Sequence, residues 1–541
     1  MPSSLPSLPS ELYQKLFSFL DSQTLFATTR VDRVWCINSI PILWREPFIT
    51  ISYHEHLYNY TEKALLIVKI YLSCLPDESK SIIKNAGINI PYPLDGNPTF
   101  NYSSFLHNLN YLVLSNSLYD LISYEPNSLL RIKPCKILIQ ELLKFLISNS
   151  SGLRSIDLTN PLISKGSPMP LKYLGKSFMN IFSVPGANTF ISNLQSFSCT
   201  GHSPPELIYS ISEMAKRIRS LGLQDLQDND GIIALINAQK ELKYVRIDSY
   251  YPSDISQIYS ALKSQSNSLC KVSIIGHERF LLDLFCQCPN LEEFIFIHDR
   301  PEDKDYDDLV HPMEGKIQVR DRPRYRQPSN TRKNILSAQA QLHASIPILN
   351  LTKLRKMKIH QRLLRTEHRS MLIQLIQKTQ GSLQDIDFDF IVPLDPGFSK
   401  QLFMTICSEC PNLQRLNIQI HNDLITQLTR LFDNCENLIE IHLSGSHDDT
   451  QDITNTIFKI GKYLPKNLQL FDLNLQFWTY SLNSVKSFLS QCYEKLNRKP
   501  LIYVIHIRFF KQELKDLLEQ YEKKGVIVVK TRKVAYVDLF F

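Results

Sequence analysis

The sequence lacks the features that would place the protein in a membrane or in an oxidising compartment. None of its 541 residues belong to an apolar run near the roughly 18 needed to span a bilayer. Residues 1–10 have neither the basic start nor the apolar block of a signal peptide. The 11 cysteines are an odd number scattered along the chain, which favours reduced thiols over a disulfide framework. The composition therefore predicts an intracellular protein, cytoplasmic or nuclear, without membrane association.

Signatures of catalysis and of cofactor binding are also lacking. The sequence has no phosphate-binding glycine loop and no nucleophile elbow, and the His-Glu-His run at 54–56 lacks the spacing that places two imidazoles on one helix face. Cys407 and Cys410 have the spacing of a zinc pair, but zinc takes four ligands, and only Cys435 and His421 are candidates to complete the site. We therefore expect no enzyme activity, no metal and no cofactor, with a zinc site as the alternative.

Charge of one sign is scarce as well. The formal net charge of +7 comes from 60 basic and 53 acidic residues, far from the concentrated basic stripe of a nucleic-acid binder. The most charged run, 299–334, has an acidic first half and a basic second half with several prolines, which indicates a solvated loop that interrupts the fold. Its segment 320–333 contains Arg and Tyr without a folded platform for stacking bases, so nucleic-acid binding is disfavoured.

Large apolar residues are dense near the beginning of the chain, in LPSELYQKLFSFLDSQTLFATTRVDRVWCINSIPILW (8–44). Their spacing predicts three short helices, with Asp21 as the N-cap of the second and Pro41 closing or kinking the third. About 40 residues rarely form a stable core alone. The residues expected as surplus apolar surface are Leu5, Leu8, Phe17 and Trp44. Either another protein or the rest of this chain is expected to cover them.

The order of these residues resembles the F-box motif over nearly its whole length. The match runs from Leu8-Pro9-x-Glu11-Leu12 through Val31-x-Arg33-x-Trp35 to Leu43-Trp44. One departure is Asp32, where the family usually has a small or polar residue such as Ser or Cys. The resemblance implies docking on the Skp-type adaptor of a cullin and RING ubiquitin ligase. The residues that match adaptor-facing or bundle-forming positions, two roles that the sequence does not divide, are Leu8, Pro9, Leu12, Leu16, Leu20, Leu25, Val31 and Trp35.

Beyond residue 101 an apolar-x-x-apolar-x-apolar pattern recurs, and each copy follows a helix-like segment. Its copies begin at residues 109, 153, 194, 218, 242, 269, 291, 354, 383, 413, 438, 468 and 502. The steps from 194 to 291 and from 354 to 468 are 22 to 30 residues, close to the 20 to 29 of leucine-rich repeats. The step from 291 to 354 contains the charged loop.

The repeats resemble the cysteine-containing leucine-rich repeats of F-box proteins, because Cys288, Cys410 and Cys435 each stand three residues before a strand's first leucine. The resemblance implies an α/β fold, with a three-helix F-box before an irregular horseshoe of strand-helix repeats. It is irregular because the ninth repeat position seldom has the usual Asn or Cys. The expected segments are an F-box at 1–50, a helical linker at 51–100 and repeats at 101–541, with a charged loop at about 299–345 and a C-terminal cap at about 500–541.

In each repeat the first, fourth and sixth positions are expected to face the core, and the third and fifth to face the inner, concave side. The resulting candidates for substrate contact are Tyr244, Arg246, Lys271, Lys356, Lys358, Asp385, Asp387, Arg415 and His442. They indicate a basic patch beside an acidic one, which could select a charged partner segment. The alternative is that any solenoid fills these positions with polar residues.

Together, the two resemblances imply a non-catalytic substrate-recognition subunit of a Skp-cullin-F-box ubiquitin ligase. Such a subunit holds a target protein near a ubiquitin-charged enzyme and so promotes ubiquitin-dependent degradation by proximity. One alternative is a non-degradative scaffold that binds partners through its repeats. Another is a metal-binding or nucleic-acid-binding protein that uses the cysteine pairs or segment 320–333. The sequence does not specify the substrate.

Overall fold

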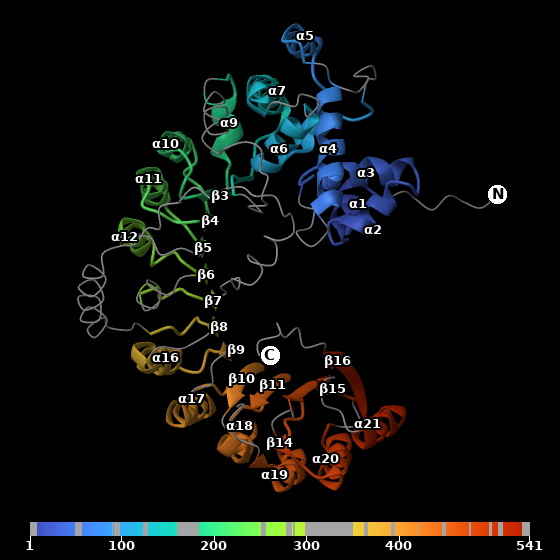
Figure 1. The fold of residues 1–541 in the computed structure, drawn as a ribbon, viewed down its shortest axis with the longest axis vertical. Coiled ribbons are helices and arrows are strands. Elements are labelled where there is room, and N and C mark those ends of the chain that lie inside the picture. Colours follow the sequence, from blue (N-terminus) through green and yellow to red (C-terminus); the bar gives the residue numbers. More distant parts are fainter. Residues whose placement is uncertain are drawn as a thin grey trace, which may run out of the picture. The chain divides into compact units, whose positions relative to one another are not determined.

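A computed structural model shows two compact units, Met1–Gln265 and Ser266–Phe541. The residues that it describes are 8–48, 57–88, 90, 98–122, 128–159, 182, 184–249, 256–276, 284, 287–297, 350–361, 366–390, 395–420, 422–445, 451–474, 478–496, 500–506 and 512–532. The charged loop expected at about 299–345 lies outside them. Each unit is mixed α/β, with parallel strands joined by helices (Figure 1).

Three short helices begin the first unit, as predicted: α1 (Ser10–Phe17), α2 (Ser22–Thr28) and α3 (Arg33–Leu43). Asp21 caps α2, since its Oδ1 accepts a hydrogen bond from Thr24 N at 2.8 Å. Asp32 caps α3 in the same way, through Trp35 N at 2.7 Å. This capping role explains a carboxylate at a position where the F-box family usually has a small or polar residue. Pro41 lies inside α3, which continues to Leu43.

Two of the residues expected as surplus apolar surface are buried instead. Phe17 packs inside the bundle, with its ring centroid 5.2 Å from that of Trp35. Trp44 packs against the segments that follow the bundle, with ring centroids 5.3 Å from Tyr71 and 4.3 Å from Tyr102. The prediction was wrong for Phe17, because spacing alone does not tell which side of a helix faces the core of the bundle. Trp44 follows the stated alternative, in which the rest of this chain covers the surplus residue.

The remaining two surplus residues have different outcomes. Leu8 is 45% exposed, as expected, and Leu5 lies outside the described residues. The segment predicted as a helical linker contains α4 (Leu57–Ser73) and α5 (Asp77–Asn85). Tyr71 lies on α4, so Trp44 fixes the three-helix bundle to the next helix of the same unit.

The first unit then forms parallel strands in chain order. The strands are β1 (Asn108–Asn110), β2 (Ser155–Asp157), β3 (Ser196–Thr200), β4 (Ser220–Gln224) and β5 (Tyr244–Ser249). The helical elements around them are η1 (Tyr102–Phe105), α6 (Tyr111–Leu121), α7 (Ser128–Asn149), α9 (Ala187–Ser192), α10 (Pro205–Met214), α11 (Asp230–Ala238) and α12 (Ser256–Ser264). In Figure 1, α10, α11 and α12 lie next to one another on the same side of their strands.

The second unit repeats this arrangement. Its parallel strands, in sheet order, are β6 (Lys271–Gly276), β7 (Glu293–Ile297), β8 (Lys356–Gln361), β9 (Asp385–Phe390), β10 (Arg415–Ile420), β11 (Glu440–Gly445), β13 (Leu470–Asn474), β15 (Leu501–His506) and β16 (Ile527–Arg532). Its helices are α16 (Thr366–Lys378), α17 (Pro396–Glu409), α18 (Leu428–Asn434), α19 (Thr454–Ile460), α20 (Leu482–Lys495) and α21 (Gln512–Lys523), with 3-10 turns η3 (Asn422–Gln427) and η4 (Gly461–Tyr463). A short pair, β12 (Gln451–Asp452) and β14 (Trp478–Thr479), lies apart from this sheet.

Strand register confirms the repeat pattern between 194 and 468. Third positions pair with third positions, as in Lys356 with Asp385 and Asp385 with Arg415. The first, fourth and sixth positions are buried, for example Leu413, Leu416 and Ile418. Because a strand's side chains alternate between its two faces, the third and fifth positions lie opposite this core.

Two predicted repeat starts are wrong. Asn108 pairs with Ser155, a third position, so the first repeat begins at Leu106 and not at 109. From Tyr111 the chain is helical, since the Asn110 side chain caps α6 by accepting from Val113 N at 3.0 Å. Near the C-terminus, Ile502 pairs with the third position Leu470, so that repeat begins at residue 500.

Gly201 permits a close main-chain approach that no other residue would allow. A β-carbon there would lie 2.5 Å from Asp225 O and 2.6 Å from Gln227 N, both main-chain atoms. Gly201→Ala is therefore expected to lower the free energy of unfolding by about 1–3 kcal/mol. Gly397→Ala is the control, because its β-carbon would meet only Asp395 Oδ1 at 3.4 Å. Denaturant unfolding measures both, and equal stability of the two variants would refute the packing constraint.

Candidate functional site

Large apolar side chains are exposed over the three N-terminal helices. The members of this N-terminal apolar surface are Leu8, Leu12, Leu16, Phe19, Phe26, Val31, Val34 and Ile37, each between 43% and 79% exposed. A soluble monomer seldom exposes so many large apolar side chains within so short a stretch unless they form an interaction site. The surface is therefore the first candidate site.

The structure divides the residues that match the F-box motif into two groups. Those exposed on the bundle are Leu8, Pro9, Leu12, Leu16 and Val31, whereas Leu20 and Trp35 are half-buried and Leu25 is buried. Trp35 packs against Tyr13 and Phe17 with tilted rings, whose centroids lie 6.4 Å and 5.2 Å from that of Trp35. The exposed group is free to contact a partner, and Leu25 and Trp35 build the bundle that presents it.

Four members of the N-terminal apolar surface were absent from the residues assigned to adaptor contact: Phe19, Phe26, Val34 and Ile37. Apolar residues lie on more than one side of these helices, so helical spacing does not separate the exposed side from the packed one. Val34 and Ile37 are exposed, whereas Trp35, between them on α3, is half-buried. Only the packing of the three helices makes this distinction.

Polar groups next to this surface have defined roles. The hydrogen bond from Thr24 N lowers the pKa of Asp21 below its usual value, so its charge remains at the start of α2. The Arg30 guanidinium lies over the Phe26 ring, 4.8 Å from the centroid. This contact holds a cation at the edge of the apolar surface.

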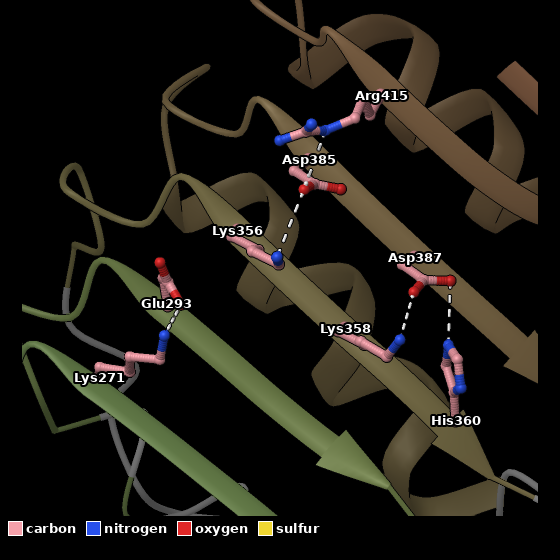
Figure 2. A network of polar contacts seen from close by, with 8 residues as sticks. All are labelled: Lys271, Glu293, Lys356, Lys358, His360, Asp385, Asp387 and Arg415. Atoms are coloured by element: carbon pink, nitrogen blue, oxygen red, sulfur yellow. Dashed lines mark ion pairs between the residues drawn. The ribbon is translucent and has the colours of Figure 1, made fainter. Parts of the chain in front are cut away.

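The second candidate site is the polar face of the sheet in the second unit (Figure 2). Third repeat positions alternate in charge across neighbouring strands: Lys271, Glu293, Lys356, Asp385, Arg415 and Glu440. Lys271 Nζ lies 2.5 Å from Glu293 Oε2. Asp385 Oδ2 lies 3.7 Å from Lys356 Nζ and 3.2 Å from Arg415 Nε. Opposite charges thus meet across strand boundaries.

Asp387 is the centre of the same network. Its carboxylate oxygens lie 2.9 Å from Lys358 Nζ and 3.0 Å from His360 Nε2. Asn417 Nδ2 donates to it at 2.7 Å. Burial alone would raise the pKa of Asp387, but His360, Lys358 and Asn417 outweigh burial and lower the pKa well below its usual value.

The prediction of a basic patch beside an acidic one is therefore wrong for the described strands. Parallel register places the third position of each strand beside the third position of the next, and the residue types alternate in sign. The charges pair within the sheet, and the residues of Figure 2 form an internal ion-pair network. We refer to these eight labelled residues as the ion-pair network.

Replacing Asp387 by Asn is expected to reduce the pH dependence of stability at acidic pH. A carboxyl whose pKa is lowered by folding stabilises the protein above its unfolded pKa, near 3.9. That stabilisation is lost as the pH falls from about 5 through the folded pKa. Denaturant unfolding at pH 7 and at pH 4 compares Asp387→Asn with Asp389→Asn, an exposed carboxylate on the same strand. The same pH slope in both variants would contradict this assignment.

The other predicted substrate contacts are not members of the network. Tyr244 and Arg246 belong to β5 of the first unit, where Arg246 Nη2 lies 3.0 Å from Asp248 Oδ2. His442 is on β11, and its Nδ1 lies 2.9 Å from Oδ2 of the buried Asp472. The structure thus brings together Lys271, Lys356, Lys358, Asp385, Asp387 and Arg415.

His360 was not predicted as a site residue, although it belongs to the ion-pair network. It is the seventh residue of its repeat, and only the third and fifth positions were expected to face this side. The signal was available, because alternation continues when a strand is longer than five residues. β8 reaches Gln361, so His360 lies on the same face as Lys358.

The cysteines considered for zinc are buried core residues. Burial raises the pKa of the Cys407 and Cys435 thiols to about 12, which keeps them protonated at neutral pH. Cys435 Sγ donates to Cys410 O at 3.2 Å. No group of three His, Cys, Asp or Glu side chains with the geometry of a metal site occurs among the described residues, and His421 lies outside them.

Asparagines directly before the first leucine of two repeats, Leu291 and Leu413, link neighbouring repeats. Asn290 Nδ2 donates to Asn267 O at 2.7 Å, and Asn412 Nδ2 donates to Gly381 O at 3.0 Å. Each bond joins the residue before a repeat's first leucine to the loop that ends the preceding repeat. Cys288, Cys410 and Cys435 are buried. Packing therefore accounts for the cysteine pattern, and hydrogen bonds between repeats account for Asn290 and Asn412.

No described helix has both the length and the apolar character needed to cross a membrane. Comparison of the chain with models of known protein families and with curated proteins finds no match. The case for a function therefore depends on the motif residues and on the geometry of the two candidate sites.

Proposed function

We propose that this protein is the substrate-recognition subunit of a Skp-cullin-F-box ubiquitin ligase. In this proposal the three N-terminal helices are an F-box that binds the Skp-type adaptor, and the strand-helix repeats are leucine-rich repeats that bind the protein to be ubiquitinated. The chain itself makes and breaks no bonds. It accelerates ubiquitin transfer by raising the local concentration of the target near the charged enzyme, in the cytoplasm or the nucleus.

The N-terminal apolar surface is the observation that carries the proposal. Leu8, Pro9, Leu12, Leu16 and Val31 match the motif and are exposed. Full burial of one such aliphatic side chain contributes about 1.5–3 kcal/mol. Association costs several kcal/mol in lost freedom of motion, so several buried side chains are needed before a stable complex forms. The N-terminal apolar surface has enough exposed apolar side chains to stabilise such a complex.

The packing beneath this surface supports the same function. Trp35 and Leu25 hold the bundle together, and Trp44 anchors it to Tyr71 on α4. A bundle fixed in this way keeps a bound adaptor at a defined distance from the helices that follow. Such a fixed distance favours transfer reactions that depend on proximity.

Co-purification with a Skp-type adaptor tests the first half of the proposal. The full chain and the adaptor are co-expressed, and the complex is captured through a tag on the adaptor. A one-to-one complex is expected, and the double variant Leu8→Ala/Pro9→Ala is expected to weaken it. Failure of the unmodified chain to bind would overturn the F-box assignment.

Reconstitution with the cullin, the RING protein and a charged ubiquitin-conjugating enzyme tests the second half. Ubiquitin transfer to this chain or to a bound partner is expected, and it should depend on the adaptor. Adaptor binding without any transfer would favour the alternative, a non-degradative scaffold that binds partners through its repeats.

A further inference from the structure

Apolar side chains occupy outward positions on β6 and β7. These two strands precede β8 and β9, which carry most of the ion-pair network. Ile275, Ile295 and Ile297 are only half-buried, on the face of the sheet that carries Lys271 and Glu293. Ile275 pairs with Ile297 across β6 and β7. These three residues form the first apolar spot, and the register of β7 with β8 places Lys358 and His360 at its edge.

A second apolar spot lies on the last strands of the same sheet. Leu470, Ile502 and Val528 form one cross-strand row over β13, β15 and β16. All three occupy the third repeat position, where the strands from β6 to β11 carry charged residues. Val528 is 40% exposed, and Leu470 and Ile502 are half-buried. The third repeat positions are therefore charged from β6 to β11 and apolar on β13, β15 and β16.

Between the two spots, the ion-pair network determines which partner is acceptable. Lys356, Asp385, Lys358 and Asp387 already neutralise one another at 2.9 to 3.7 Å. A segment with a high charge of one sign would meet both signs at close range and gain little. Paired charges of this kind contribute specificity more than affinity, whereas apolar contacts supply most of the binding energy.

The strand order gives the separation of the two spots. From β7 to β15, the middle strand of the second spot, the sheet passes through β8, β9, β10, β11 and β13. Neighbouring strands lie about 4.8 Å apart, so the spots are about 29 Å apart across the sheet. An extended chain advances about 3.3–3.6 Å per residue, so about eight to nine residues bridge this distance.

We propose that this face binds an extended segment of a partner protein that crosses the strands. The segment has two apolar side chains about eight to nine residues apart, separated by polar residues of low net charge. The first apolar side chain contacts Ile295 and Ile297, and the second contacts Val528 and Ile502. The inference rests on the proposed function, because the segment would belong to the protein presented for ubiquitination.

Selection from a phage-displayed library of random 16-residue peptides on the full chain tests this proposal. The enriched peptides are expected to share two apolar positions about seven to ten residues apart, with low net charge between them. The synthesised peptides should bind the double variant Ile295→Thr/Val528→Thr at least about tenfold more weakly, because the β-branched Thr keeps the strand but loses apolar contact. Ile82→Thr on α5 is the control, since Ile82 is 40% exposed, as is Val528.

No enrichment of this pattern, or equal binding to the double variant and the unmodified chain, would overturn the inference. Adaptor binding is measured on the same preparations. Intact adaptor binding without peptide binding would refute the inference alone, whereas peptide binding without adaptor binding would refute the F-box assignment alone.

Discussion

Replacing Leu12 and Leu16 by Asp is expected to weaken binding of the Skp-type adaptor at least about hundredfold. Burial of each leucine contributes about 1.5–3 kcal/mol, and each 1.4 kcal/mol is a factor of ten in the dissociation constant. The introduced carboxylates also lose water without gaining a partner. Leu12 is 47% and Leu16 54% exposed, so the substitutions remove little packing from the bundle. Calorimetric titration of the purified adaptor into each protein measures the effect.

Leu66→Asp is the matched control for this double variant. Leu66 lies on α4, outside the three-helix bundle, and is 54% exposed, as is Leu16. It is expected to bind the adaptor as the unmodified chain does, with circular dichroism showing equal helix content in all proteins. Equal affinity of the double variant and the control would show that the N-terminal apolar surface is not the binding site.

Replacing Trp44 by Ala is expected to lower the free energy of unfolding of the N-terminal helices by about 3–5 kcal/mol. The indole is 9% exposed and meets Tyr71 edge-on at 5.3 Å and Tyr102 at 4.3 Å between ring centroids. Aromatic pairs of this geometry add to the energy of simple burial. Without the indole, the bundle loses its main aromatic contact with α4.

Hydrogen exchange of α1 to α4 measures the loss, because local opening is reported element by element. Trp44→Phe keeps an aromatic ring at this position and is expected to cost less than half as much. If the Ala and Phe variants exchange at the same rate as the unmodified chain, Trp44 is not the anchor of the bundle.

Local signals in the sequence were sufficient to predict the three N-terminal helices and most strands, but not α6, where a strand was expected. Asp21 begins α2 because its side chain accepts a main-chain hydrogen bond, which depends only on the next three residues. The repeats between 194 and 468 are confirmed because three buried positions recur within a narrow range of spacings. Near Leu106 and residue 500 the pattern is offset by a few residues, and a single copy does not fix its own register.

The distribution of charge on the sheet could not be predicted residue by residue. Lys356 and Asp385 were expected to lie in separate patches, and they form an ion pair across β8 and β9. Which side chains meet depends on strand pairing, which is a relation between distant parts of the chain. The same reason explains why Phe17 was expected on the surface of the bundle, although its partner Trp35 lies on another helix, and why the sequence left open whether another protein or this chain covers Trp44.

Hydrogen exchange of the full chain, with and without a saturating amount of the Skp-type adaptor, tests the central claim most directly. The account predicts new protection confined to residues 8–43, with the largest change on α1 around Leu12 and Leu16. The repeats should exchange at unchanged rates. Protection absent from α1 to α3, or protection that appears only in the repeats, would contradict the claim that the N-terminal apolar surface is the adaptor-binding site.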